Sequence, residues 1–99
     1  MGPLLIAVNP NTNRIYVTNE RSNTVSVIDG SLNTVVATVA VGSLPHDITI
    51  NPATDRVYVA NTGSDNVSVI DGSLNSVVAS VPVGNDPRGI AVKASTNRI

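Results

Sequence analysis

The chain of 99 residues contains no cysteine, no tryptophan and no phenylalanine, and its only aromatic residues are two tyrosines. Without cysteine the chain forms no disulfide and carries out no thiolate chemistry. Two tyrosines cannot provide the row of aromatic side chains on which the bases of single-stranded nucleic acid stack. Charged residues make up only 13% of the chain and the formal net charge is −1. We therefore expect no surface that attracts nucleic acid or an anionic membrane.

Long hydrophobic runs are also absent. No stretch of the sequence approaches the roughly 20 apolar residues of a transmembrane helix, so we expect no membrane insertion. Residues 1–8 lack the basic segment and long apolar core of a signal peptide, and none is expected. Apolar residues make up 41% of the chain, and valine is the most frequent of them. Because β-branched side chains fit a pleated surface, this composition predicts an all-β protein.

A repeat of 42 residues runs through the chain. Residues 16–57 align with residues 58–99 without a gap and are identical at 23 of 42 positions, and residues 1–15 follow the same pattern. Such a period is typical of a β-propeller blade. Each period is predicted to hold four strands, A to D, at about 4–8, 14–18, 24–29 and 34–41, again at about 46–50, 56–60, 66–71 and 76–83, and with a third strand A at about 88–92.

Turn residues and strand composition support this division. Gly30 and Gly72 follow an aspartate at the start of each C–D hairpin, where glycine is expected to take a positive φ. Strand D at 34–41 is apolar or uncharged on both sides, with Val35, Ala37, Val39 and Val41 predicted to share one face. This pattern indicates a strand covered on both faces. A propeller is favoured over a solenoid of β-hairpins.

The predicted fold is therefore an all-β partial β-propeller of two four-stranded antiparallel blades plus the start of a third. Blade 1 covers about residues 4–41, blade 2 about 46–83, and the third begins at about 88–99. A blade buries its faces only against neighbouring blades, so two blades alone leave apolar sheet faces exposed. Two explanations remain open: the chain is a fragment of a longer propeller, or copies assemble into a ring. Assembly would favour an even number of blades, such as six from three chains or eight from four.

The tetrapeptide 16–19, Tyr-Val-Thr-Asn, returns as Tyr-Val-Ala-Asn at 58–61, and residues 66–71 read Asn-Val-Ser-Val-Ile-Asp. With these motifs, essentially the whole chain resembles the YVTN family of β-propeller repeats. The resemblance implies a cell-surface or exported protein, of the surface-layer or surface-antigen kind, that presents loops for binding. It predicts a non-catalytic scaffold that binds a protein or a glycan, with no cofactor. The alternative is a fragment of a quinoprotein-like or reductase-type propeller enzyme whose active site lies in missing blades.

The resemblance also implies which residues bind. Loops on a rigid sheet scaffold carry recognition in propellers, which points to the B–C loops at 19–23 and 61–66 and the D–A loops at 42–46 and 84–88. The candidate binding residues in these loops are Glu20, Arg21, Ser43, His46, Asp65, Asp86 and Arg88.

Metal binding and catalysis have weaker support in the sequence. His46 begins a strand A, which lines the central channel of a propeller, and with Asp47 it is a candidate channel ligand. One imidazole without Cys, Met or a second His is a poor metal site, so no metal is expected. Arg14, Arg56 and Arg98 recur in phase. They form either a ring for an anionic ligand or, as we favour, a repeated pairing with a turn carboxylate.

Overall fold

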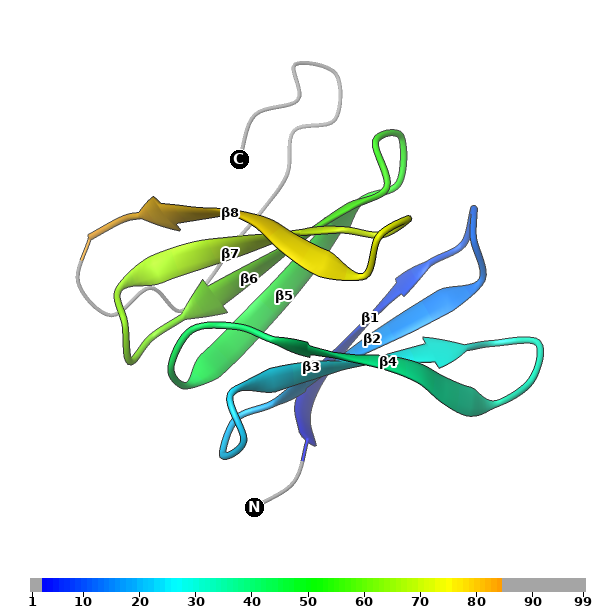
Figure 1. The fold of residues 1–99 in the computed structure, drawn as a ribbon, viewed down its shortest axis with the longest axis horizontal. Helices are drawn as coiled ribbons and strands as arrows, with labels where there is room; N and C mark the ends of the chain where they lie inside the picture. Colours follow the sequence, from blue (N-terminus) through cyan, green and yellow to red (C-terminus); the bar gives the residue numbers. More distant parts are fainter. Residues whose placement is uncertain (1–2, 85–99) are drawn as a thin grey trace.

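The computed structural model describes residues 3–84, which form eight antiparallel strands in two four-stranded sheets (Figure 1). The first sheet has the order β1-β2-β3-β4 and the second the order β5-β6-β7-β8. Their bounds are β1 Pro3–Asn9, β2 Arg14–Asn19, β3 Thr24–Asp29, β4 Thr34–Ala40, β5 Pro45–Asn51, β6 Arg56–Asn61, β7 Asn66–Asp71 and β8 Ser76–Pro82. The predicted all-β architecture of two blades is confirmed; the expected strand at 88–92 lies outside the described residues.

Each hairpin turn ends on an Asn or Asp in the left-handed backbone region. These residues have φ between 53° and 57° and are Asn13, Asn23, Asn33, Asp55, Asp65 and Asn75. Asn and Asp adopt this conformation more readily than other residues with a side chain. The prediction that Gly30 and Gly72 supply the positive φ is wrong, because no glycine in the described part of the chain has one.

Gly30 is needed for a different reason, which is close approach between two turns. Its N–H donates to the carbonyl oxygen of Asn13 at 2.8 Å. A Cβ at position 30 would lie 2.8 Å from that same oxygen. Gly72 stands equally close to Asp55 in the second blade. In each blade these glycines let the C–D turn lie against the A–B turn.

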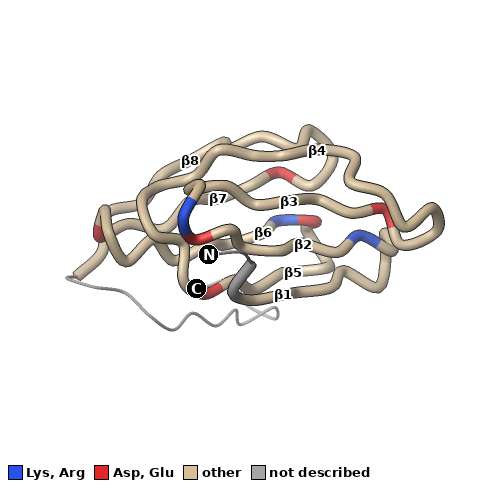
Figure 2. The backbone as a smooth tube through the Cα atoms, turned by 90° about the horizontal axis from the view of Figure 1, so that it is seen from below, with Lys and Arg blue, Asp and Glu red and all other residues tan. Residues whose placement is uncertain are grey.

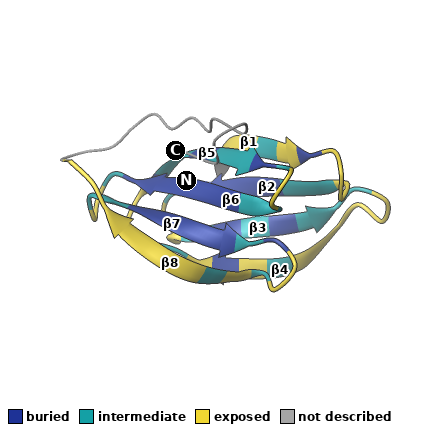
Figure 3. Cartoon of the chain, turned by 90° about the horizontal axis from the view of Figure 1, so that it is seen from above, coloured by how far each residue is buried: buried dark blue, intermediate teal, exposed yellow. Residues whose placement is uncertain are grey.

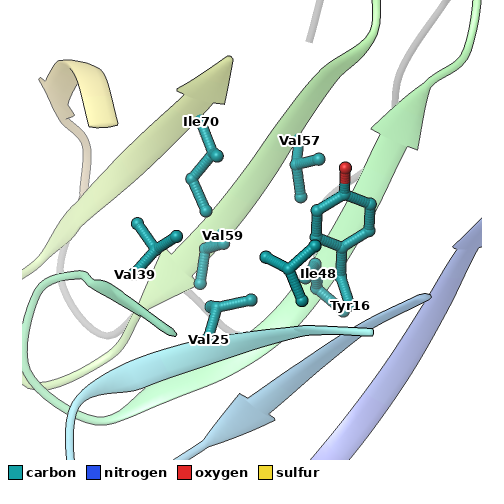
Figure 4. Packing of buried hydrophobic residues seen from close by; sticks show 8 residues of the cluster. Tyr16, Val25, Val39, Ile48, Val57, Val59 and Ile70 are labelled. Carbon is teal, nitrogen blue, oxygen red and sulfur yellow. The ribbon is translucent and has the colours of Figure 1, made fainter. Parts of the chain in front are cut away.

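The core lies between the two sheets. Tyr16, Val25, Val27 and Val39 of the first sheet pack against Ile48, Val57, Val59 and Ile70 of the second (Figure 4). The innermost strands β1 and β5 contact each other extensively, whereas the outer strands β4 and β8 meet more sparsely. The backbones of the two blades thus approach each other most closely at the inner strands β1, β2 and β5.

Strand D is covered less than its composition predicted. A β-bulge between Val27 and Ile28 shifts the register, so Val35 faces away from Ala37, Val39 and Val41. On the side toward the second sheet Val39 is buried, but Val35 on the other side is 59% exposed. Figure 3 shows β8 exposed along most of its length. Cover on both faces is therefore wrong for the described residues, because each sheet has a neighbour on one side only.

Charged residues are few, and Figure 2 shows both signs scattered along the backbone with no stretch of one sign. Within residues 3–84, no helix is long and apolar enough to cross a membrane.

Candidate functional site

Three loops meet at one end of the two blades, on the left of Figure 1. They are the β2–β3 turn (20–23), the β4–β5 connection (41–46) and the β6–β7 turn (62–65), and together we call them the loop end. Leu44 N–H donates to Asn23 Oδ1 of the first blade at 3.0 Å. On the other side, Thr62 N–H donates to the Leu44 carbonyl at 3.0 Å. The connection is therefore held between the two B–C turns.

The second blade adds further contacts to this clamp. Gly63 N–H donates to the Ser43 carbonyl at 3.0 Å, and Ser43 N–H donates to Ser64 Oγ at 3.1 Å. A Cβ on Gly42 would lie 2.8 Å from Asn61 Cγ, so only glycine fits there. These contacts fix a polar surface of hydroxyl and amide groups at the point where two blades join.

In each blade, the asparagine that ends strand B donates side-chain hydrogen bonds to the strand that follows the B–C turn. Asn61 is fully buried, and its amide donates to Asn66 Oδ1 at 2.9 Å and to Ser68 Oγ at 2.8 Å. Its Oδ1 accepts no hydrogen bond from the described residues. Asn19 binds Ser26 Oγ at 2.8 Å in the same way. The last residue of each Tyr-Val-Thr/Ala-Asn motif therefore fixes the turn that carries the candidate site.

His46 and Glu20 pair across the two blades. His46 Nδ1 lies 3.7 Å from Glu20 Oε2, with side chains 34% and 27% exposed. Asp47, the neighbouring candidate, accepts a hydrogen bond from Ile48 N–H at 2.8 Å. In the described part of the chain no three His, Cys, Asp or Glu side chains gather as a metal would require. At 3.7 Å the two groups are too far apart for a hydrogen bond, and they form an ion pair when the imidazole is protonated.

The other predicted binding residues are distributed around this pair. Arg21 and Ser43 are exposed at the loop end, and Asp65 occupies the left-handed position of its turn. Asp86 and Arg88 lie outside the described residues. The structure thus brings Glu20 and His46 into contact and places Arg21, Ser43 and Asp65 in the same group of loops.

The arginines in phase lie at the opposite end of the blades. Arg56 Nε lies 3.9 Å from Asp71 Oδ2, a pairing with a turn carboxylate. The hydroxyl and N–H of Ser73 donate to Asp71 Oδ1 at 2.7 and 2.9 Å. These bonds, with a smaller contribution from Arg56, lower the pKa of the Asp71 carboxyl. Arg98 lies outside the described residues.

Sequence reasoning missed a polar contact between the blades at this end. Asn9 is fully buried, and its amide donates to Asp55 Oδ1 at 3.0 Å. Close by, burial raises the pKa of Tyr16, and Asp55 raises it further while Arg14 lowers it. The signal in the sequence was the phase of Asn9 and Asn51, which suggested only a turn.

The two stacked four-stranded sheets, joined by a repeated strand order and a shared loop end, are adjacent blades of a β-propeller. Residues 6–88 match the model of the family described as lactonase, 7-bladed β-propeller. The chain belongs to this family.

Solved structures and a curated protein add to this result. Hydrazine synthase of Kuenenia stuttgartiensis superposes with a TM-score of 0.90 and 29% identity, over 95% of this chain and 27% of that one. The periplasmic gluconolactonase PpgL of Pseudomonas aeruginosa superposes with a TM-score of 0.70 and 22% identity, over 88% of this chain and 27% of that one. The PE-PGRS family protein PE_PGRS18 of Mycobacterium tuberculosis is 54% identical over 43 residues, 43% of this chain and 9% of that protein.

The chain therefore spans about a quarter of the solved structures and under a tenth of the curated relative. The expectation that the protein is not an enzyme is contradicted. The family match and the similarity to a hydrazine synthase point to propellers of the enzyme type. The prediction failed because it took the lack of catalytic residues in two blades as evidence about the whole propeller.

Proposed function

We propose that this chain forms two adjacent blades of an enzyme-type propeller whose active site is completed by further blades. The observation that carries the proposal is the lactonase-family match over residues 6–88. Since a propeller gathers loops from several blades at one end, a two-blade unit contributes one part of such a site. The loop end is the part that this chain contributes.

The substrate we propose is a polyhydroxylated lactone. The family is described by lactonase activity, and one similar structure is a gluconolactonase. The loop end suits such a ligand because it offers the exposed hydroxyl of Ser43 and the exposed guanidinium of Arg21. The hydroxyls of Thr62 and Ser64 already donate to the Leu44 carbonyl and to Asn66 Oδ1, and can still accept a hydrogen bond from a ligand. Hydroxyl groups can donate to or accept from sugar hydroxyls, and a guanidinium pairs with the carboxylate of the product.

His46 is the side chain of the loop end that we assign to proton transfer. Its imidazole takes a proton from the water that attacks the lactone carbonyl carbon, while the carboxylate of Glu20, 3.7 Å from Nδ1, stabilises the imidazolium. The ester bond between the carbonyl carbon and the ring oxygen then breaks. The ring oxygen takes the proton back and leaves as the hydroxyl of an open-chain hydroxy acid.

Titration of the 99-residue chain with the product gluconate, followed by the NMR shifts of backbone amides, tests this assignment. We expect saturable shifts confined to residues 20–23, 41–46 and 62–65. His46→Gln and Arg21→Gln are expected to weaken binding, whereas Asp29→Asn at the opposite end of the blades is the matched control. Shifts that fall on the A–B and C–D turns and not on the loop end contradict the assignment.

We further propose that the repeats are of the YVTN type, in a protein exported to the periplasm or the cell surface. Support comes from the motifs at residues 16–19 and 58–61 and from a similar structure described as periplasmic. The binding partner in that location would be a protein or a glycan. Fractionation of cells that produce the tagged protein from its own gene tests the location, and recovery in the cytoplasm alone contradicts it.

A further inference from the structure

The ion pair at the loop end joins residues of two different blades. Glu20 belongs to the β2–β3 turn of blade 1 and His46 to the start of β5 in blade 2, and Oε2 of the first lies 3.7 Å from Nδ1 of the second. One period later the sequence has Thr62 and Arg88 at these two positions. The pair is therefore particular to this junction and is not a general feature of the repeat.

The β4–β5 connection, which leads into His46, is fastened to blade 2 through its backbone. Thr62 donates twice to the Leu44 carbonyl, from its N–H at 3.0 Å and from its hydroxyl at 3.1 Å. Gly63 N–H donates to the Ser43 carbonyl at 3.0 Å. These bonds fix the connection relative to the blade that carries the imidazole.

The link from this connection to blade 1 is made by Asn23, at the end of the turn that carries Glu20. Its Oδ1 accepts from Leu44 N–H at 3.0 Å, and its carbonyl accepts from Val41 N–H at 3.0 Å. The carbonyl bond continues the pairing of β3 with β4 inside blade 1. The side-chain bond instead reaches the middle of the connection, two residues before His46.

The backbone conformation of Leu44 depends on such support. With φ at 52°, this leucine occupies the left-handed region, where its Cβ is unfavourably placed. The residues in phase with it in the sequence are Gly2 and Asp86, which belong to types that adopt this region more readily. A residue held in an unfavourable conformation persists only where its surroundings fix it, and such residues concentrate at functional sites. Here the hydrogen bonds to the N–H and to the carbonyl provide that support.

We propose that Asn23 is a positioning residue that sets the distance between Glu20 and His46. It holds the connection on the side of blade 1 while Thr62 holds it on the side of blade 2, so the imidazole stays opposite the carboxylate. Asparagine suits this position because it tolerates a φ of 57° and its side chain supplies the acceptor. The positioning follows from these contacts alone, whereas its effect on a ligand rests on the proposed function.

Two substitutions at position 23 separate the side-chain bond from the backbone conformation. Asn23→Gly tolerates the positive φ and keeps the backbone carbonyl, but it removes the acceptor for Leu44 N–H. Asn23→Asp keeps an acceptor, and Asp65 shows that aspartate fits the same place in blade 2, with φ at 54° and its carbonyl accepting from Val83 N–H at 3.1 Å. Asn33→Gly is the matched control, because this residue has a φ of 56° in the C–D turn at the opposite end of blade 1.

The contact is measured by the change that Glu20→Gln causes in the NMR signals of the His46 ring, which belong to the only histidine of the chain. At about pH 5 an ordinary imidazole is protonated and an ordinary glutamate is ionised. Since the effect of a charge falls with distance, we expect the change in Asn23→Gly to be less than about half of that in the wild type. The Asn23→Asp and Asn33→Gly chains are expected to keep it.

Three results of this measurement overturn the proposal. They are a change of wild-type size in Asn23→Gly, an equal reduction in Asn33→Gly, and ring signals of the wild type that do not respond to Glu20→Gln. Circular dichroism verifies that each variant keeps its sheets.

Titration with gluconate tests the consequence for the ligand separately. Loss of one hydrogen bond that positions His46 is expected to raise the dissociation constant of Asn23→Gly about 3–10-fold above that of Asn33→Gly. Equal constants in the two variants overturn this consequence. Ring signals that change as expected in chains that do not bind gluconate support the positioning by Asn23 and contradict the lactone proposal alone.

Discussion

Single residues fix the turns of these blades through their backbone conformation. Six of the seven residues with positive φ are Asn or Asp, and the seventh is Leu44. The seven do not include a glycine, and glycine is needed instead where two chain segments touch, at Gly30, Gly42, Gly63 and Gly72. Residues that tolerate a positive φ and residues that lack a Cβ therefore occupy different positions in these turns.

The close approach at Gly30 leads to the first prediction. In Gly30→Ala the new Cβ meets the Asn13 carbonyl oxygen at 2.8 Å, and backbone cannot yield as a flexible side chain does. We expect the free energy of unfolding to fall by about 1–3 kcal/mol, as in other overpacked sites. Urea denaturation measures the change. Gly84→Ala is the control, because a Cβ there has no neighbour within 4 Å, and an equal loss in both variants contradicts the explanation.

Leu44 leads to the second prediction, of the opposite sign. With φ at 52° its side chain crowds its own backbone, while its N–H and carbonyl are both hydrogen-bonded. Leu44→Asn keeps those backbone bonds in a residue suited to this region, so we expect a gain of about 0.5–1 kcal/mol in the free energy of unfolding. Thermal denaturation measures it. Leu74→Asn, another exposed leucine but without a positive φ, is expected to give no gain.

At the scale of elements, the C–D turn of blade 2 makes stability depend on pH. The pKa of Asp71 is lowered below its ordinary 3.8, first by the Ser73 hydroxyl. A lowered pKa in the folded state stabilises the protein above the ordinary value, and this contribution is lost as pH falls through the folded pKa. Ser73→Ala is therefore expected to reduce stability at neutral pH and to have no effect well below 3.8.

Urea denaturation at both pH values measures this third prediction. Ser31→Ala is the control from the other blade. The Ser31 hydroxyl accepts from the Asn13 amide at 3.1 Å and does not bond the turn carboxylate. Its removal is expected to change stability equally at the two pH values. A Ser73→Ala effect that persists at low pH shows that the hydroxyl acts by other means than the Asp71 charge.

The repeat explains how far the sequence predicts these elements. Comparison of two periods that share 23 of 42 residues places the strand ends within about two residues, because turn residues recur in phase. The bulge at Val27 was not predictable, since apolar residues on both sides of strand D hide a change of register. The contact of His46 with Glu20 joins two different blades, and its distance depends on how the sheets stack. No spacing within one period contains that information.

At the scale of the whole molecule, one interface between the two sheets holds the described chain together. The side of the second sheet that carries Ile48 lies in this interface, whereas the same side of the first sheet has no neighbouring blade among the described residues, and its Ile6, Val8 and Val35 are exposed. Stability in repeat proteins is roughly the sum of terms for each unit and each interface between neighbours. Two blades contain one such interface, so the energetic value of a face residue depends on whether a neighbour lies on it.

The pair Ile6 and Ile48 tests this view directly, since the same residue in the same phase is 66% exposed in one blade and 7% in the other. In dilute solution we expect Ile48→Ala to cost about 2–5 kcal/mol, as burial in a packed core implies, and Ile6→Ala to cost under about 0.5 kcal/mol. Urea denaturation at one low protein concentration measures both losses. Equal losses in the two variants would contradict the view that a neighbouring blade decides how much a residue on this side of the sheet contributes.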